Sequence, residues 1–272
     1  MRGLRLVLAT ASFVALTLLF LDGTGYAVAH WGWLAKVQFL PALLSLSAFT
    51  WMALAVMLGI LAVTFLFGRV YCSVICPLGI FQDGVAWIVR LVWRRPHSYA
   101  PAHTRMRVAF LVAALGAGVA GLHFAFLAPY GIYGRAVAAF LTPLARLGCN
   151  ALVPWLQAHG CYLVRSVEIV VPTAATLICA GALLVAVALC AAVKGRLWCN
   201  AVCPVGTLLG CVSRHARVKP VLDAAKCVNC GLCARACKAQ CIDVAAHQVD
   251  TSRCVVCFNC SSVCGKGALT WK

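Results

Sequence analysis

Two runs of cysteine toward the C-terminal end have the spacing that iron–sulfur clusters require. The runs CVNCGLCARAC (227–237) and CVVCFNCSSVC (254–264) both read C-x2-C-x2-C-x3-C, the spacing with which a small domain holds two [4Fe–4S] clusters. In this arrangement the fourth cysteine of each run binds the cluster of the other run. The expected ligands of one cluster are Cys227, Cys230, Cys233 and Cys264, and those of the other are Cys254, Cys257, Cys260 and Cys237. A structural zinc site is the alternative, but it would use pairs of cysteines rather than quartets.

Three residues in this region depart from the usual pattern. Lys238 and Gly265 follow the fourth cysteines, where proline is usual, and this removes no ligand. Cys241 is a spare cysteine close to the first run, and we expect it to be a buried thiol beside the cluster.

A second cysteine pattern occurs twice. FGRVYCSVICPLGIFQD (67–83) recurs as KGRLWCNAVCPVGTLLG (194–210), each copy directly after a long apolar run. On a helix Cys72 and Cys76 share a face, as do Cys199 and Cys203, and the proline after each second cysteine turns the chain. The four thiols could hold a shared Fe–S centre or two redox sites, or form reversible disulfides. Packing of small apolar side chains is the plainer interpretation, and repetition of the whole motif argues against it. Arg69 and Arg196 are expected to extend to the lipid head groups.

The composition requires a non-aqueous environment. The 272 residues are 64% apolar and 11% charged, whereas soluble domains are roughly 45–50% apolar and 25% charged. A small secreted disulfide scaffold would explain the 18 cysteines only in a short polar chain. Four apolar runs are long enough to span a bilayer as helices, namely Leu4–Leu21, Phe39–Phe67, Val108–Ala128 and Val167–Val193. The first could instead be a signal peptide cut after Ala29, but we favour a retained helix.

The predicted fold has two parts. Residues 1–219 form an all-α membrane domain of four transmembrane helices, built from two parallel helical-hairpin repeats, 1–107 and 108–219. Residues 220–272 form a small α+β domain like a bacterial two-cluster ferredoxin, with little need of an apolar core.

The positive charge indicates orientation rather than a nucleic-acid partner. The net charge is +17, and all but four of the 23 lysines and arginines fall on one side of the predicted membrane. Because the positive side of a membrane protein is cytoplasmic, both termini and the ferredoxin-like domain are expected in the cytoplasm. The four on the other side are Lys36, Arg135, Arg146 and Arg165.

The opposite, outer face carries aromatic and histidine residues. One interpretation is that these residues bind a quinone. Alternatively, two of the histidines ligate a haem, or the residues simply lie at the membrane interface as an aromatic belt. We also consider a disulfide between Cys149 and Cys161 on this side. The aromatic and histidine residues are His30, Trp31, Trp33, His123 and His159.

The sequences GRVYCSVICPLG and GRLWCNAVCPVG, followed by two ferredoxin motifs, resemble the NapH/MauN/NosR-type polyferredoxin membrane proteins. The resemblance covers nearly the whole chain. It implies a protein of the bacterial inner membrane that passes electrons between the quinone pool or cytoplasmic donors and a periplasmic redox enzyme. Such a protein would be the electron-transfer subunit of a quinol dehydrogenase complex. The stretch WLAKVQFLPALL (33–44) departs from NapH and is nearer to a branch found beside FMN-binding partner proteins.

The sequence favours an electron carrier over two other classes of function. It lacks a G-x-G-x-x-G nucleotide motif with an acidic follower and a soluble catalytic domain, so the terminal reaction is expected to belong to a partner. A redox maturation factor would instead use the thiols to reduce a metal ion or a disulfide in another enzyme. A passive anchor would need none of the cysteines in the tail.

Overall fold

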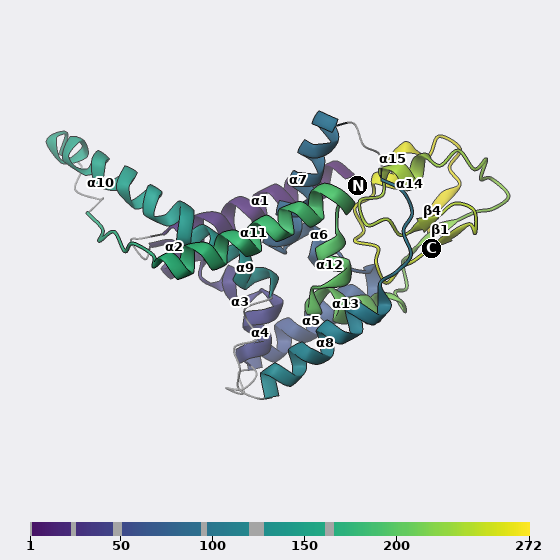
Figure 1. Ribbon diagram of the computed structural model, residues 1–272, viewed down its shortest axis with the longest axis horizontal. Helices are drawn as coiled ribbons and strands as arrows, with labels where there is room; N and C mark the ends of the chain where they lie inside the picture. Colours follow the sequence, from purple (N-terminus) through teal and green to yellow (C-terminus); the bar gives the residue numbers. More distant parts are fainter. Residues whose placement is uncertain (1, 23–25, 46–50, 94–96, 120–127, 161–165) are drawn as a thin grey trace.

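The computed structural model describes residues 2–22, 26–45, 51–93, 97–119, 128–160 and 166–272 (Figure 1). The chain is mostly helical, with a small domain of short strands and helices at one end. Among the described residues, three helices are long and apolar enough to cross a membrane. They are α1 (Arg2–Leu21), the continuous helix Pro129–Trp155, and α11 (Ala174–Lys194).

The helices match the four expected spans only in part. Helix α1 covers the first apolar run, and α11 covers residues 174–193 of the fourth. The second run contains α4 (Phe39–Ser45) and α5 (Trp51–Phe67), and the third contains most of α8 (Thr104–Val119). Residues 46–50 and 120–127 of these runs lie outside the described part of the chain. The described parts of α5 and α8 are 17 and 16 residues long.

The segment expected to be the second outer loop is helical instead. Helix α9 (Pro129–Ala136), the π-helical turn η3 (Val137–Leu141) and α10 (Thr142–Ala158) follow one another without a break. Two arginines and Pro154 interrupt the apolar sequence here, which hides the helix from a search for apolar runs. Pro129 occupies the first turn of α9, where proline needs no hydrogen-bond acceptor.

The two halves of the chain pack in the same pattern. Helix α7 (Pro77–Trp93) follows the first cysteine motif and packs on α1 and α11, whereas α13 (Pro204–Ser213) follows the second motif and packs on α8 and α5. Helix α7 therefore links α1 of the first half to α11 of the second half, and α13 links α8 of the second half to α5 of the first half. Figure 1 shows two arms that diverge from the motifs, one with α1 and α11 and the other with α5 and α8. Short helices α2 (Tyr26–Trp31) and α3 (Trp33–Lys36) lie between α1 and α4.

The C-terminal domain is small and mixed. Strand β1 (Pro220–Leu222) pairs antiparallel with β4 (Leu269–Trp271), and β2 (Ile242–Asp243) pairs with β3 (Gln248–Val249). Two one-turn helices, α14 (Leu232–Ala236) and α15 (Asn259–Val263), each carry one cysteine of a run. The expected ferredoxin-like α+β architecture is therefore present.

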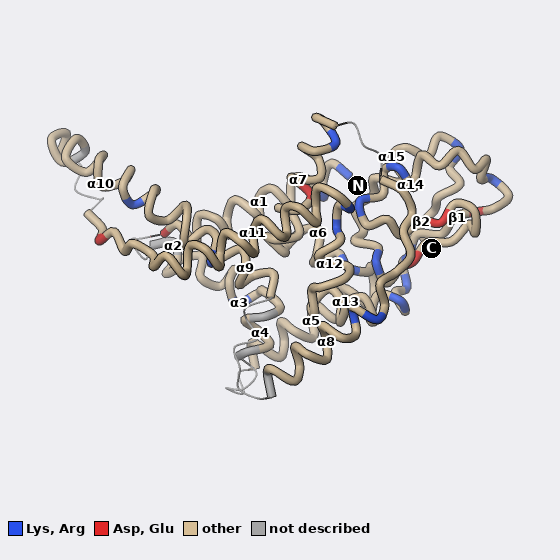
Figure 2. The backbone as a smooth tube through the Cα atoms, viewed as in Figure 1, with Lys and Arg blue, Asp and Glu red and all other residues tan. Residues whose placement is uncertain are grey.

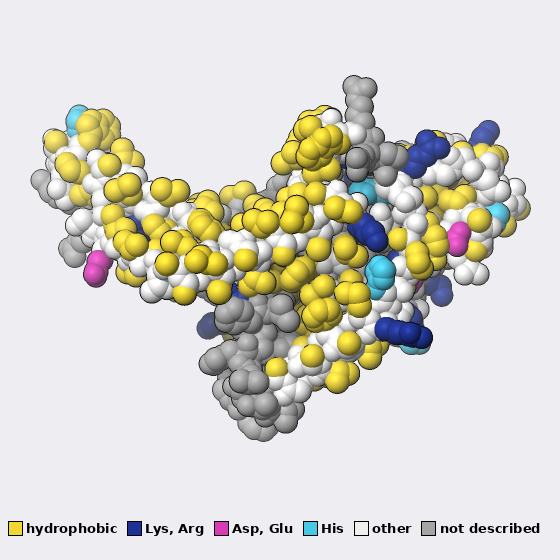
Figure 3. Space-filling view, viewed as in Figure 1, with side chains coloured by type: hydrophobic (Ala, Val, Ile, Leu, Met, Phe, Trp, Pro, Cys, Tyr) yellow, Lys and Arg dark blue, Asp and Glu magenta, His cyan; other side chains and the backbone are white. Residues whose placement is uncertain are grey.

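Charge and apolar surface divide along the molecule. Lysines and arginines gather where the C-terminal domain meets the helices (Figure 2). Apolar side chains cover the visible face of the arm that contains α11 and α10 (Figure 3). Exposed leucine, valine and tryptophan side chains on α1, α5 and α11 are normal for helices surrounded by lipid.

Candidate functional site

Each repeated motif folds as a one-turn helix, a break, and a new helix. After α5 the chain turns at Gly68, whose φ is +79°, and α6 (Tyr71–Val74) carries Cys72. After α11 it turns at Gly195, with φ +62°, and α12 (Leu197–Ala201) carries Cys199. Positive φ favours glycine at both turns. The second cysteine of each motif lies in the break, immediately before the proline that begins α7 or α13.

The four motif thiols are all buried in one place. Each of these cysteines is 3 or 4% exposed and is a free thiol. Cys72, Cys76 and Cys203 belong to a single apolar cluster. Burial raises the pKa of Cys72 to about 11; Arg69 opposes the rise and Cys199 adds to it. Because a metal ligand must be the thiolate, this pocket disfavours the ligand form unless a cationic centre compensates for the charge.

Glycines allow the chain to close tightly around these thiols. A Cβ on Gly79 would lie 2.3 Å from the Cys72 carbonyl oxygen, and one on Gly206 would lie 2.3 Å from that of Cys199. The Gly206 N–H donates to Cys203 Sγ at 3.3 Å, and Gln82 Nε2 donates to Cys199 Sγ at 3.1 Å. Hydrogen bonds of this kind to ligand sulfurs tune Fe–S centres.

The prediction that Arg69 and Arg196 extend to the lipid head groups is wrong. Their exposures are 0 and 1%, and each crosses to the other motif. Arg69 donates to the Gly206 carbonyl at 3.0 Å and to Asn200 Oδ1 at 2.7 Å. Arg196 donates to the Cys72 carbonyl at 2.6 Å. A buried guanidinium needs several acceptors, and these lie in a part of the chain that local sequence does not identify.

Asp83 links three segments through a buried ion cluster. It is bonded to Arg5 of α1, to Arg196 Nε at 2.7 Å, and to Lys238 Nζ at 2.7 Å. The cations hold the pKa of Asp83 well below its usual range, against the effect of burial. This role of Asp83, Arg5 and Lys238 was not predicted from the sequence. An available signal was the scarcity of acids, because the chain has only six Asp and Glu and one of them lies in a motif.

The eight tail cysteines fall into an inner set, which contacts the helices, and an outer set. The inner set, close to the helices, brings Cys237 near three cysteines of the second run. The outer set brings Cys264 near Cys227 and Cys233 of the first run. The fourth cysteine of each run therefore lies near cysteines of the other run, and the assignment of these residues as cluster ligands stays a prediction. The inner set is Cys237, Cys254, Cys257 and Cys260, and the outer set is Cys227, Cys230, Cys233 and Cys264.

Cys241 lies beside the inner set as a buried thiol, as expected. It is 1% exposed, and its Sγ is 3.5 Å from Cys237 Sγ. Lys238, in the position where proline is usual, extends to Asp83. The lysine thus connects the inner set to the first membrane motif.

The inner set is docked directly on the membrane motifs. Cys257 and Val255 belong to the same apolar cluster as Cys72, Cys76 and Cys203. Arg69 Nε donates to the Cys254 carbonyl at 3.3 Å, and the Arg196 N–H donates to the Lys238 carbonyl at 3.0 Å.

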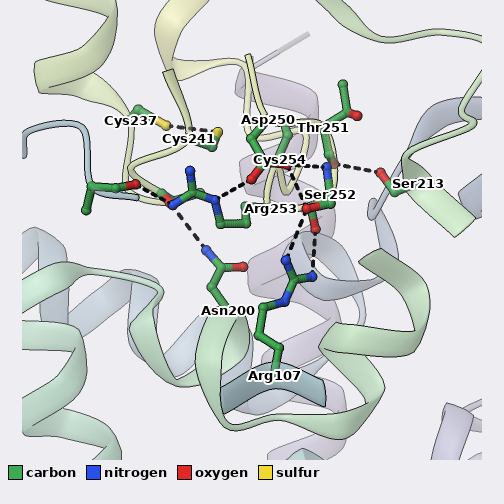
Figure 4. Close-up of polar contacts among 12 residues, drawn as sticks. Arg107, Asn200, Ser213, Cys237, Cys241, Asp250, Thr251, Ser252, Arg253 and Cys254 are labelled. Carbon is green, nitrogen blue, oxygen red and sulfur yellow. Dashed lines mark hydrogen bonds and ion pairs between the residues drawn. The ribbon is translucent and has the colours of Figure 1, made fainter. Parts of the chain in front are cut away.

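Polar contacts fasten the loop of the inner set to the helices (Figure 4). Arg107 of α8 donates to Ser252 Oγ at 3.1 Å, and Ser213 of α13 donates to the Thr251 carbonyl at 3.0 Å. Arg253 is paired with Asp250 at 2.6 Å and also donates to the Ala100 carbonyl. The contacts come from both halves of the membrane domain, so the loop has a fixed position against the motifs.

The thiol groups have the chemistry that [4Fe–4S] clusters need. Among the described residues, no three His, Cys, Asp or Glu side chains meet as they would around one metal ion. A cluster makes a different demand, because each thiolate binds a different iron. Buried thiols, N–H donors to sulfur, and nearby Arg69, Arg196 and Lys238 suit an anionic cluster with thiolate ligands.

The outer-face candidates are dispersed in the structure. His30 and Trp31 lie on α2, Trp33 lies on α3, and His159 follows α10 with its ring 4.5 Å from that of Trp155. His123 and Cys161 lie outside the described residues. Cys149 is an exposed free thiol on α10.

Comparison with known proteins assigns the repeated motif to a family. The 4Fe-4S binding domain matches twice, at residues 49–96 and 174–221, once on each motif. NapH, a ferredoxin-type protein of Haemophilus influenzae, is 25% identical over 213 residues, which are 73% of this chain and 60% of NapH.

Two shorter matches are closer in sequence. An uncharacterized protein of Methanocaldococcus jannaschii is 46% identical over 74 residues, 27% of this chain and 29% of that protein. The putative electron transport protein YccM of Escherichia coli is 36% identical over 67 residues, 25% of this chain and 19% of YccM. The chain thus spans less than two thirds of each relative, and no solved structure matches. The chain thus contains two matches to the 4Fe-4S binding domain, and it is similar over 73% of its length to the ferredoxin-type protein NapH and over a shorter stretch to the putative electron transport protein YccM.

Proposed function

We propose that this protein carries electrons at the cytoplasmic face of the bacterial inner membrane, between the quinone pool or cytoplasmic donors and a redox partner. The observation that carries the proposal is the docking of the inner cysteine set on the four motif cysteines. Three thiol groups then follow one another from the membrane boundary outward. A periplasmic redox enzyme or an FMN-binding protein is the partner that the family resemblance favours.

The proposal assigns one [4Fe–4S] cluster to the inner set and one to the outer set. A further Fe–S centre is proposed on Cys72, Cys76, Cys199 and Cys203, where each half of the chain supplies two thiols. When bound, such clusters accept and donate single electrons. The protein contributes the buried apolar packing around Cys257 and the cations Arg69, Arg196 and Lys238, which offset cluster charge and should raise its potential.

The positions of the helix ends support a topology with both termini in the cytoplasm. Arg5 near the start of α1 and Arg107 near the start of α8 both lie beside the C-terminal domain or its motif contacts. The ends of α5 and α11 lie there too, since the Leu66 carbonyl accepts from the Val218 N–H and the Lys238 carbonyl accepts from the Arg196 N–H. Because α1 supplies Arg5 to the ion cluster, we propose that this helix is retained.

A cleft between α1 and α7 is the proposed quinone site. It has a volume of about 460 Å³ and adjoins the ion cluster of Asp83. One wall is apolar, with Leu6, Ile80 and Trp87, as a quinone tail requires. Arg5 also lines it, and Arg5 Nε is buried without a hydrogen-bond partner, so it can donate to a carbonyl oxygen of a quinone head.

This location replaces the outer face as our preferred quinone site. Electron transfer slows steeply with distance, and all three thiol groups lie at the C-terminal-domain end of the helices. Helix α7 presents Trp87 and Trp93 on its exposed side, each 66% exposed, as interfacial helices do. His97 also lines the cleft, and burial and nearby cations lower its pKa, which favours the neutral imidazole that can accept a hydrogen bond from a quinol hydroxyl.

The test uses protein purified without oxygen, reduced with dithionite and freed of excess reductant. Menaquinone is added, and the reduced-cluster EPR signal is followed in time. Leu6→Trp fills the cleft, whereas Leu4→Trp adds the same ring at an exposed position on the same helix. We expect rapid loss of signal in the wild type and in Leu4→Trp, and loss at least about tenfold slower in Leu6→Trp, the effect of about 1.4 kcal/mol of lost binding.

Each outcome has a separate meaning. Equal rates in the three proteins would refute the cleft as the site. Persistence of the signal in the wild type, with clusters intact, would refute quinone exchange. That result would redirect attention to the maturation role, which a mixed disulfide trapped after Cys76→Ser would support.

A further inference from the structure

The outer cysteine set lies on an exposed surface. In the outer set Cys230 is exposed, Cys227 and Cys264 are partly exposed, and Cys233 is buried. In the inner set Cys254 is partly exposed, and the other three cysteines are buried. The inner set is covered by the membrane motifs. The outer set is therefore the part of the proposed electron path that a soluble protein can approach.

The surface over the outer set has an apolar centre. Val228, Leu232 and Val263 are 61, 45 and 37% exposed, and they flank Cys230 and Cys264 in the sequence. Gly231 and Gly265 lie among them, and a Cβ on either would meet nothing within 4 Å. Small residues in open space leave the backbone near the cysteines accessible to a partner.

The edge of this surface is basic. Lys226, Arg235 and Lys266 are all exposed and border the outer cysteines. The nearest acid in the sequence, Asp223, is only partly exposed, and its Oδ1 accepts from the Ala225 N–H. An apolar centre with a cationic edge is complementary to a protein with an apolar centre and an acidic edge.

We propose that this surface, the outer docking patch of Val228, Leu232 and Val263 with Lys226, Arg235 and Lys266, binds a small acidic electron-carrier protein of the cytoplasm. The inference rests on the proposed electron-transfer function and adds the partner class. Opposite charges steer the carrier and the apolar centre lets it approach closely, while few strong contacts allow fast release.

The β1–β4 pair provides a matched control. Its membrane-proximal end carries Lys219 and Lys272, where the Val218 N–H bonds the Leu66 carbonyl. Its far end leads to the outer set, where the Asp223 N–H bonds the Ala268 carbonyl. Both pairs of lysines are exposed, so Lys226→Glu/Lys266→Glu and Lys219→Glu/Lys272→Glu change the net charge equally at opposite ends of the domain.

The experiment measures binding of an acidic [2Fe–2S] ferredoxin, used as the probe, to the full chain in detergent at low and high salt. We expect wild-type affinity to fall with salt and Lys226→Glu/Lys266→Glu to bind at least about tenfold more weakly at low salt. Lys219→Glu/Lys272→Glu should bind as the wild type does. Leu232→Asp should weaken binding at high salt as well, because it disrupts the apolar centre.

Three results would overturn the proposal. The first is that both lysine double variants weaken ferredoxin binding equally, and the second is that neither weakens it. The third is that Lys226→Glu/Lys266→Glu loses binding to anionic vesicles but still binds ferredoxin as the wild type does. The last result would identify a membrane contact instead. Quinone exchange is measured separately on the wild-type protein, so its failure and the failure of carrier binding are distinct results.

Discussion

Asp83→Asn should be the most damaging single change outside the cysteines. The Asp83 side chain is 11% exposed, and it balances the side chains of Arg196, 0% exposed, and Lys238, 12% exposed, together with that of Arg5. Asparagine keeps the shape and one acceptor oxygen but removes the charge. Breaking a buried ion pair from one side costs about 3–5 kcal/mol, because the remaining charges lose their counter-ion.

The expected loss can be measured as a shift in the thermal unfolding midpoint. At about 2–4 °C per kcal/mol for a chain of this order of size, a loss of 3 kcal/mol lowers Tm by about 6–12 °C. Tryptophan fluorescence and cluster absorbance during heating, in one detergent, follow the helices and the cluster domain together. Lys238→Met is the comparison and should cost only about 1 kcal/mol, since Asp83 keeps two arginines.

The double variant Asp83→Asn/Lys238→Met measures the coupling between the two charges. In Asp83→Asn the Lys238 charge has no counter-ion, and Lys238→Met removes that charge. The double variant should therefore lose about 1 kcal/mol less unfolding free energy than the two single variants lose together. Strict additivity, or an Asp83→Asn loss no larger than that of Lys238→Met, would show that the ion cluster does not fasten the domain to the motifs.

The remaining predictions concern the thiols, the glycines and pH. Cys230→Ser should remove the iron of one cluster, whereas Cys241→Ser should keep all the iron and shift the potential of the inner cluster; unchanged iron in Cys230→Ser would contradict the ligand assignment. Gly79→Ala should displace the loop of Cys72 and lower iron content, whereas Gly84→Ala, in open space on the same helix, should keep it and stabilise by up to about 1 kcal/mol. The folded-state pKa values of Asp83 and Asp250 are lowered, so their stabilisation should be complete above about pH 4, the usual carboxyl pKa, and decline as pH falls further. A midpoint that stays constant during acid titration would contradict this.

The predicted cysteine groups depend on local spacing, and their assignment as cluster ligands stays a prediction. The crossed pairing of Cys237 and Cys264 follows from two runs of fixed spacing, and the thiols of the repeated motif meet as their repetition suggested. These features depend on residues close together in the sequence, which is why a pattern can identify them.

The partners of the buried charges could not be predicted in the same way. Arg69 binds residues of the other half and of the C-terminal domain, and no local pattern specifies which acceptors will surround a guanidinium. The helix of residues 129–158 was missed for a related reason, because its arginines and prolines resemble a loop until tertiary packing is known. The interpretation of Lys238 as a simple departure from pattern likewise missed its long-range contact with Asp83.

The crossed arginines have a consequence for biogenesis. During synthesis the first motif leaves the ribosome with Arg69 but without Gly206, Asn200 or the Cys254 carbonyl, so its guanidinium has none of these acceptors. Arg196 arrives later and finds the Cys72 carbonyl already present. The first half of the chain therefore stays incompletely packed until the second half and the C-terminal domain have been synthesised. We therefore expect iron insertion at the motif thiols to occur late, after the whole chain is synthesised. A chain that ends before residue 194 should be degraded by proteases rather than accumulate with only the first motif.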